Sequence, residues 1–140
     1  MPASNSSPAA SFGLLVLRLV AGALLLYGHG WSKLVHFSER ARHFADPLHL
    51  GSDRSLMLAV LAEVICALLV AIGFATRFAA GVIVILFAVI LFAVIPGGPF
   101  GERELPMLYG AAYLCIVLTG PGSYAVDAKY GPKVKFGGGK

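Results

Sequence analysis

Four ionisable side chains lie inside segments that are otherwise apolar. Arg18, His29 and Lys33 belong to the first apolar run, and Glu63 belongs to the second. A charge in hydrocarbon is unfavourable, so an ionisable residue there is by default a candidate for function. A carboxylate can accept a proton, an imidazole can hydrogen-bond to a carbonyl, and a basic side chain can neutralise the acid. We therefore take these four residues as the candidate site.

The spacing places the three basic residues on one side of the first helix. At 100° per residue, His29 lies about 20° and Lys33 about 60° around the helix from Arg18. On an antiparallel second helix, Glu63 lies at a depth between Arg18 and His29. Two interpretations follow, and both can hold together. Arg18 and Glu63 form a structural ion pair, or Glu63 and His29 border a polar pocket that binds a cofactor headgroup or relays protons. Lys33, near the interface, is expected to extend towards the lipid headgroups.

Neither the histidines nor the cysteines form a metal or thiol motif. His29, His36 and His43 recur every seven residues. The helix is expected to break before the last of them, and no carboxylate or cysteine completes a ligand set, so we predict no metal site. Cys66 and Cys115 form no CxxC motif and are interpreted as small buried apolar side chains. Their predicted depths match, so a contact between them stays open if the second and fourth helices touch there.

The elements that must position the candidate site are membrane helices. Hydrophobic residues make up 58% of the 140-residue chain and charged residues 13%, and the mean hydropathy is +0.82. A soluble domain of this size carries roughly a quarter charged residues. About 20 apolar residues span the hydrocarbon of a bilayer. The predicted fold is all-α, an integral membrane four-helix antiparallel bundle with helices at about 12–34, 55–74, 78–95 and 105–118.

The remaining segments are expected at the membrane surface or outside it. Within the transmembrane domain, 12–126, residues 36–52 form an interfacial or re-entrant segment. Residues 1–11 are predicted to be a disordered tail and 127–140 a polar basic tail. Asp53 is expected to cap the second helix. The first run has no basic lead-in and is too long for a cleaved leader, so we interpret it as a membrane helix.

The charge pattern bears on orientation and partners. Four spans place both termini on one side. The numbers of Lys and Arg on the two sides are nearly balanced, and we expect both termini in the cytoplasm. The net charge of +4 suits contact with anionic lipid, and no basic block indicates nucleic-acid binding. The lipid bilayer is therefore the first expected partner, and a homo-oligomer stays open.

Several short motifs follow one another along the chain. They are Leu17-Arg18-Leu19, Gly22, Tyr27-Gly28-His29-Gly30-Trp31-Ser32-Lys33-Leu34, Glu63, Gly73-Phe74-Ala75-Thr76-Arg77 and Gly120-Pro121-Gly122-Ser123-Tyr124-Ala125-Val126-Asp127. Their order and spacing resemble the DoxX family, and the likeness covers about Phe12 to Tyr130. It implies a four-helix protein of the bacterial inner membrane. It also places the family's polar signature on Arg18, Gly28, Lys33, Glu63, Gly73, Arg77 and Gly122.

The resemblance also implies a link to membrane redox complexes. The family is named for a subunit associated with thiosulfate:quinone oxidoreductase, and its members are linked to thiol and oxidative-stress defence. We predict a membrane subunit of such a complex in which Arg18, His29, Lys33 and Glu63 bind a quinone or a similar carrier. Glu63 and His29 would then relay its protons. No flavin, haem or iron–sulfur motif is visible, so the chain is at most a subunit of an oxidoreductase and receives electrons from a protein partner.

Two other classes of function are weighed against this one. The chain could be a non-catalytic anchor or assembly factor that recruits a soluble enzyme through residues 36–52 or the basic tail. A small-molecule transporter is a third hypothesis, and the lack of a visible inverted repeat argues against it.

Overall fold

The structure, a computed structural model, describes residues 6–130, and these residues form helices and no strand. Short π-helical turns, labelled η, interrupt three helical rods, so each rod carries more than one label. The first rod comprises α1 (Pro8–Leu25), η1 (Leu26–Gly30) and α2 (Trp31–Val35). The second comprises α4 (Ser52–Val60), η2 (Leu61–Cys66) and α5 (Ala67–Ile72), and the third α6 (Thr76–Val89) and η3 (Ile90–Val94). α7 (Phe100–Thr119) is a fourth long helix, and α3 (Phe37–Arg40) and α8 (Val126–Tyr130) are short.

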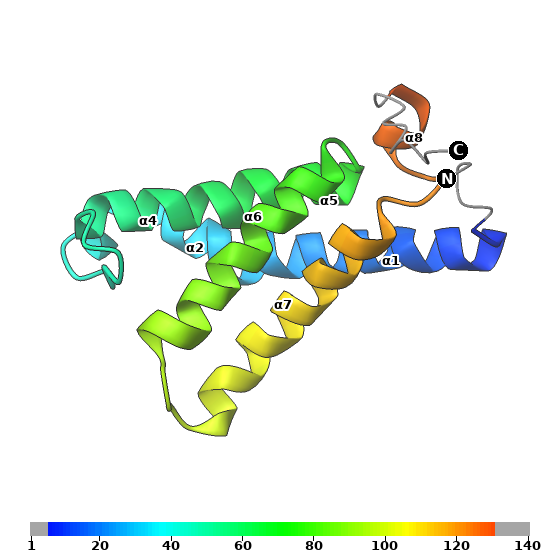
Figure 1. The fold of residues 1–140 in the computed structure, drawn as a ribbon. Coiled ribbons are helices and arrows are strands. Elements are labelled where there is room, and N and C mark those ends of the chain that lie inside the picture. Colours follow the sequence, from blue (N-terminus) through cyan, green and yellow to red (C-terminus); the bar gives the residue numbers. More distant parts are fainter. Residues whose placement is uncertain (1–5, 131–140) are drawn as a thin grey trace, which may run out of the picture.

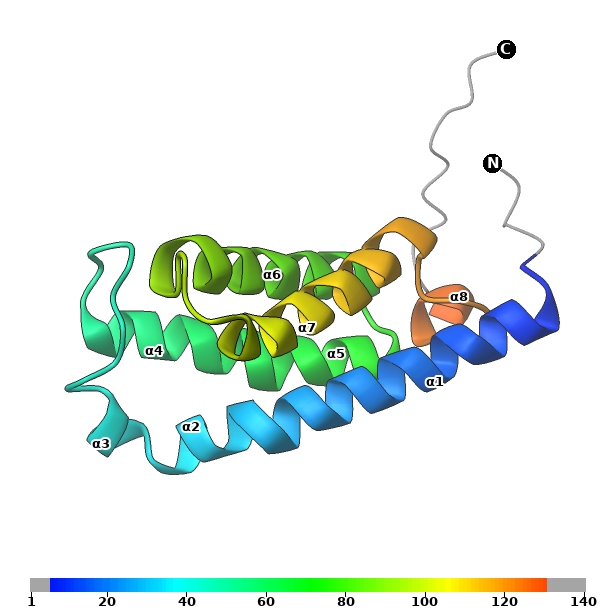
Figure 2. The same cartoon turned by 90° about the horizontal axis from the view of Figure 1, so that it is seen from below.

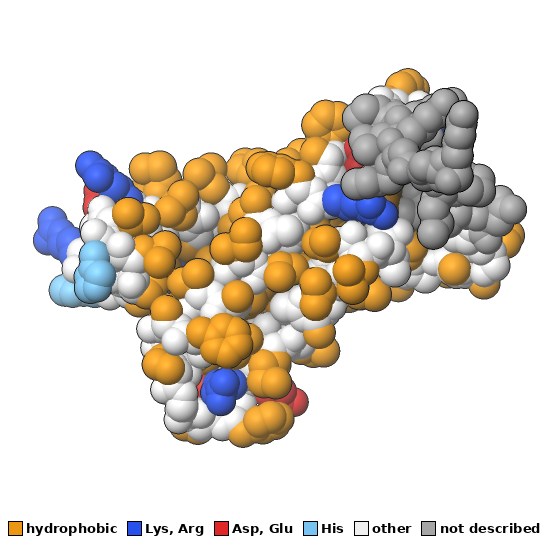
Figure 3. All heavy atoms as spheres, viewed as in Figure 1, with side chains coloured by type: hydrophobic (Ala, Val, Ile, Leu, Met, Phe, Trp, Pro, Cys, Tyr) orange, Lys and Arg blue, Asp and Glu red, His pale blue; other side chains and the backbone are white. Residues whose placement is uncertain are grey.

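The three rods are long and apolar enough to cross a membrane. A helix satisfies its own backbone hydrogen bonds and can therefore lie in hydrocarbon. Large hydrophobic side chains are exposed along all of these rods and are spread over the face in Figure 3, where charged side chains lie towards the ends of the helices. α7 differs because Glu102, Arg103 and Glu104 lie in its first turns. Its apolar part, residues 105–119, is roughly 22 Å long at 1.5 Å per residue.

The rods pack as two pairs. The first two rods lie side by side and run in opposite directions, with α1 against α5 and α2 against α4 (Figures 1 and 2). α6 and α7 form the second antiparallel pair. This second pair leans away from the first, so that the end of α6 diverges from α4 (Figure 1).

All four long helices begin before the predicted positions. Ser7 caps α1 by accepting a hydrogen bond from the Ala10 amide at 3.2 Å, so residues 8–11 of the predicted disordered tail are helical. Residues 1–5 and 131–140, and with them most of the predicted basic tail, lie outside the described residues. The predicted Asp53 cap is wrong, because Gly51 occupies the N-cap of α4 and no side chain caps it.

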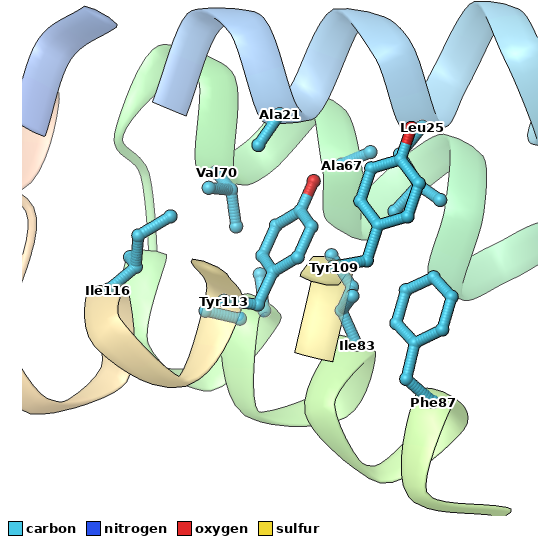
Figure 4. Close-up of a cluster of buried hydrophobic side chains, with 11 residues drawn as sticks. Ala21, Leu25, Ala67, Val70, Ile83, Phe87, Tyr109, Tyr113 and Ile116 are labelled. Carbon is cyan, nitrogen blue, oxygen red and sulfur yellow. The ribbon is translucent and has the colours of Figure 1, made fainter. Parts of the chain in front are cut away.

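The core lies between α1, α5, α6 and α7 and contains two tyrosines. Tyr109 and Tyr113 extend from α7 towards α1 (Figure 4). The Tyr109 ring stacks on Phe87 with ring centroids 5.3 Å apart. Tyr113 is fully buried. These aromatic contacts hold α7 against the other three long helices.

A buried arginine joins the first rod to the end of the second. Arg18 is fully buried, and its Nη1 donates to the carbonyl oxygens of Val70 and Ala71, each at 3.3 Å. Its Nη2 donates to the carbonyl oxygen of Tyr124 at 3.3 Å. Carbonyls in the last turn of a helix have no partner within the helix. Arg18 therefore caps the C-terminus of α5 and ties it to the segment that follows α7.

Asp127 caps the N-terminus of α6, and we predict that its replacement destabilises the protein. Its carboxylate accepts hydrogen bonds from the Ala75 and Thr76 amides at 2.8 Å and from Thr76 Oγ1 at 2.7 Å. Asp127→Ala is expected to lower the free energy of unfolding by about 1–2 kcal/mol, the usual effect of losing a helix cap. The measurement is far-UV circular dichroism during an SDS titration. Asp127→Asn keeps one acceptor oxygen and should lose less. An unchanged midpoint for Asp127→Ala would contradict the capping role.

Candidate functional site

An ion pair joins the first two rods within their apolar stretches. Lys33 Nζ lies 2.6 Å from both Oε1 and Oε2 of Glu63. The Glu63 side chain is 2% exposed and that of Lys33 16%. Within residues 6–130 no other salt bridge is present. A buried charge must be paired, so the removal of either partner would leave the other uncompensated.

Two π-helical turns and a glycine bring the pair together. η1 ends at Gly30, shortly before Lys33, and η2 contains Glu63. The two turns contact each other. A Cβ atom on Gly30 would lie 2.8 Å from the Glu63 carbonyl oxygen and 2.8 Å from Val64 Cγ2, so only glycine permits this approach. A π turn adds a residue to the helical turn and changes the direction of the residues that follow. The pairing therefore depends on these helix irregularities.

A cavity of about 430 Å³ lies beside the ion pair. Lys33, Glu63 and Ser55 supply polar groups, and the rest of the lining is apolar. The apolar walls come from α4, η2, α6 and η3, where α6 diverges from α4 (Figure 1). Ligand pockets have volumes of roughly 300–1,000 Å³ and are mostly apolar with a few placed polar groups. The cavity can accommodate part of a lipid-soluble molecule with one polar end.

A loop closes part of the cavity. We call residues 41–51, between α3 and α4, the strap. Phe44, Ala45, Pro47 and Leu48 of the strap line the cavity. The Phe44 ring centroid lies 5.9 Å from Lys33 Nζ, within the range of a cation–π contact. The strap therefore covers the ion pair on this side.

Hydrogen bonds to Asp46 hold the strap in place, and they make the conformation of the strap sensitive to pH. Its carboxylate accepts hydrogen bonds from Ser55 Oγ at 2.7 Å and from the Leu50 and Gly51 amides at 2.9 Å. These hydrogen bonds hold the pKa of Asp46 below its usual range, and the bond from Ser55 has the largest effect. A lowered folded-state pKa contributes stability that is present above the unfolded pKa and lost as pH falls through the folded one. We expect the strap to loosen below about pH 4.

Amide hydrogen exchange at Leu50 and Gly51, corrected for its intrinsic pH dependence, measures this loosening. Ser55→Ala removes the hydrogen bond from Ser55 Oγ to Asp46 and should move the loosening of the strap to higher pH. Asp46→Asn should abolish the pH dependence. Equal protection of both amides at pH 3 and pH 6 in the wild-type protein would contradict the prediction.

The structure gives three of the four predicted site residues, Arg18, Lys33 and Glu63, other partners than expected. The predicted Arg18–Glu63 ion pair is wrong, because Arg18 binds backbone carbonyls and Glu63 binds Lys33. Lys33 extends to Glu63 instead of the lipid headgroups. His29 is half-buried, with its ring edge-on to Tyr109 at a centroid distance of 5.7 Å. Arg18 and His29 do not line the cavity, so only Lys33 and Glu63 meet there.

The strap residues at the cavity were not among the predicted site residues. The mixture of Phe44 and Leu48 with charged residues in 36–52 indicated a segment partly inserted in the membrane. No pattern in that segment indicates which rod it covers. Cys66 is half-buried and Cys115 exposed, and both are free thiols, so the interpretation of Cys115 as a buried side chain is wrong.

The comparison with known families decides where the chain belongs. The DoxX family model matches residues 13–96, more than half of the 140 residues. The chain belongs to the DoxX family. This DoxX match includes Arg18, His29, Lys33 and Glu63, and α7 lies beyond it. Together with the three apolar rods, it identifies a DoxX membrane protein. No curated protein and no solved structure matches the chain.

Proposed function

We propose that this DoxX protein is the membrane subunit of a redox complex and that its cavity binds a lipid-soluble carrier such as a quinone. The observation that carries the proposal is an ion pair on the wall of an otherwise apolar cavity. Well-packed apolar residues can stabilise a helix contact as well as a buried ion pair does. An ion pair that borders a cavity therefore favours a role in binding.

The cavity residues fit the polar end of a quinone. Lys33 carries three N–H donors, and the two contacts to Glu63 leave one for a carbonyl oxygen. Glu63 is the group on the cavity wall that can take up or release a proton. The apolar walls suit a ring and its hydrocarbon chain. Reduction of a quinone to the quinol takes up two electrons and two protons, and Glu63 can pass on these protons one at a time. In this proposal Lys33, and not His29, donates the hydrogen bond to the quinone carbonyl, because His29 does not line the cavity.

The proposal extends to topology and partners. α7 crosses the bacterial inner membrane together with the three rods as a four-helix antiparallel bundle, with both termini in the cytoplasm. The contact between α6 and α7 supports this, because it shelters the short apolar part of α7. The sequence contains no flavin, haem or iron–sulfur motif, so a protein partner supplies the electrons.

Quinone binding by purified protein tests the proposal. The probe is a decyl-substituted benzoquinone added to the full chain in lipid nanodiscs, with binding followed by native mass spectrometry. The double variant Lys33→Met/Glu63→Leu removes both charges at once. We expect it to bind at least about tenfold more weakly, because a hydrogen bond from a charged donor contributes about 1.5–3 kcal/mol.

His29→Ala is the matched control. His29 lies on the same rod as Lys33 but outside the cavity lining, so this variant should bind the quinone as the wild-type protein does. Equal binding by the wild-type protein and the double variant would refute the proposal.

A further inference from the structure

The ion pair leaves the cavity without net charge. Both carboxylate oxygens of Glu63 contact Lys33 Nζ at 2.6 Å, and Glu63 is almost fully removed from solvent. An anionic ligand that binds Lys33 must compete with Glu63 and leaves that carboxylate unpaired. A cationic ligand meets the same obstacle at Lys33. Uncompensated charges of this kind are strongly unfavourable in an apolar interior. A neutral carbonyl needs only the third N–H of Lys33 and leaves the pair intact.

The rim of the cavity faces the apolar surface. Leu58 of α4 and Ile85 of α6 line the cavity, yet they are 51% and 65% exposed. They belong to the stretches of the second and third rods that can span a membrane. Phe44 and Pro47 of the strap line the cavity from outside these rods. Leu58 and Ile85 therefore form a part of the rim that is open to the hydrocarbon.

We propose that the cavity selects uncharged single-chain amphiphiles that carry a carbonyl group and admits them from the bilayer between α4 and α6. The inference rests on the proposed function and adds to it the charge class of the ligand and its route. The carbonyl oxygen accepts a hydrogen bond from Lys33. The cavity of about 430 Å³ holds the head and the first part of the chain. The rest of the chain lies in the lipid beyond Leu58 and Ile85.

Two probes with equal chains test the charge class. They are the decyl-substituted benzoquinone, which is neutral, and decane-1-sulfonate, which is anionic at every pH used. The wild-type full chain in zwitterionic nanodiscs is expected to bind the quinone at least about tenfold more tightly than the sulfonate. Glu63→Gln leaves Lys33 without its counter-charge, so this variant should bind the sulfonate at least about tenfold more tightly than the wild-type protein.

The outcomes separate the two proposals. If the wild-type protein binds neither probe, the proposed function fails. If it binds the sulfonate as well as or better than the quinone, the charge selection is overturned while a ligand-binding cavity remains. If folded Glu63→Gln gains no affinity for the sulfonate, the role of Glu63 in excluding anions is also overturned. The wild-type comparison stands even where the variant does not fold.

Bulkier residues at the rim test the route. Leu58→Phe and Ile85→Phe narrow the space between α4 and α6. Each should slow the association of the quinone on the order of tenfold, because the two helices must then move apart before the quinone can enter. Leu24→Phe is the control, because Leu24 is 57% exposed on α1 and does not line the cavity. Stopped-flow quenching of intrinsic fluorescence by the quinone gives the rates. Unchanged rates in both rim variants would overturn the lateral route.

Discussion

Glu63→Leu is expected to lower the free energy of unfolding by about 3–5 kcal/mol, because it leaves the Lys33 ammonium buried without a partner. Glu63 is 2% exposed and Lys33 16%, so little solvent is present to replace the lost carboxylate. The partial exposure of Lys33 places the expected effect towards the lower end of this range. Unfolding in mixed SDS and dodecylmaltoside micelles, followed by far-UV circular dichroism, measures the change.

The double variant Lys33→Met/Glu63→Leu is the control for this prediction. It replaces both charges with apolar side chains of similar length, and we expect it to regain most of the lost stability. Such replacements of whole buried pairs are often neutral or stabilising. If the single and double variants were equally unstable, the loss would come from packing and not from an unpaired charge.

Gly73→Ala is expected to lower the free energy of unfolding by about 2–5 kcal/mol for two separate reasons. Gly73 ends α5 with φ of 80°, in the left-handed region, where a side chain is disfavoured by about 1–2 kcal/mol. A Cβ atom at this position would also overlap Arg18 Nη1 and lie 2.5 Å from Ala125 Cβ. Forcing extra atoms into a packed site adds about 1–3 kcal/mol.

Gly97→Ala separates these two contributions. Gly97 also has a positive φ, of 70°, but a Cβ atom there meets nothing within 4 Å. This variant should show only the backbone contribution, about 1–2 kcal/mol. The difference between the two variants, measured in the same SDS titration, reports the close packing around Arg18. Equal losses would show that Arg18 moves aside without effect on stability.

The two predictions test different parts of the second rod, its middle at Glu63 and its C-terminal end at Gly73. The Arg18 and Asp127 contacts hold the end of α5 and the start of α6, whereas the Lys33–Glu63 pair borders the cavity near the strap. We therefore expect Gly73→Ala to change stability with little effect on quinone binding once the protein is folded. Glu63 substitutions should change both.

The membrane character of the chain and its helical class follow from the sequence itself. Apolar runs of about 20 residues with few charges can be stable only as helices in hydrocarbon, since no water is present to bind an exposed backbone. The resemblance to the DoxX family could also be recognised from the sequence, because Arg18, Lys33 and Glu63 are charged residues in otherwise apolar runs. These side chains could therefore be chosen as candidates from the sequence alone.

The partners of these side chains were decided only by the tertiary structure. Extrapolation at 100° per residue assumes a regular helix, but η1 lies between Arg18 and Lys33, and η2 contains Glu63. These turns, together with the close approach at Gly30, direct Lys33 to Glu63 and leave Arg18 to the carbonyls of α5. The cavity likewise depends on the angle between α6 and α4 and on the fold of the strap. Both arise from contacts between residues far apart in the chain, which a pattern along a single helix does not encode.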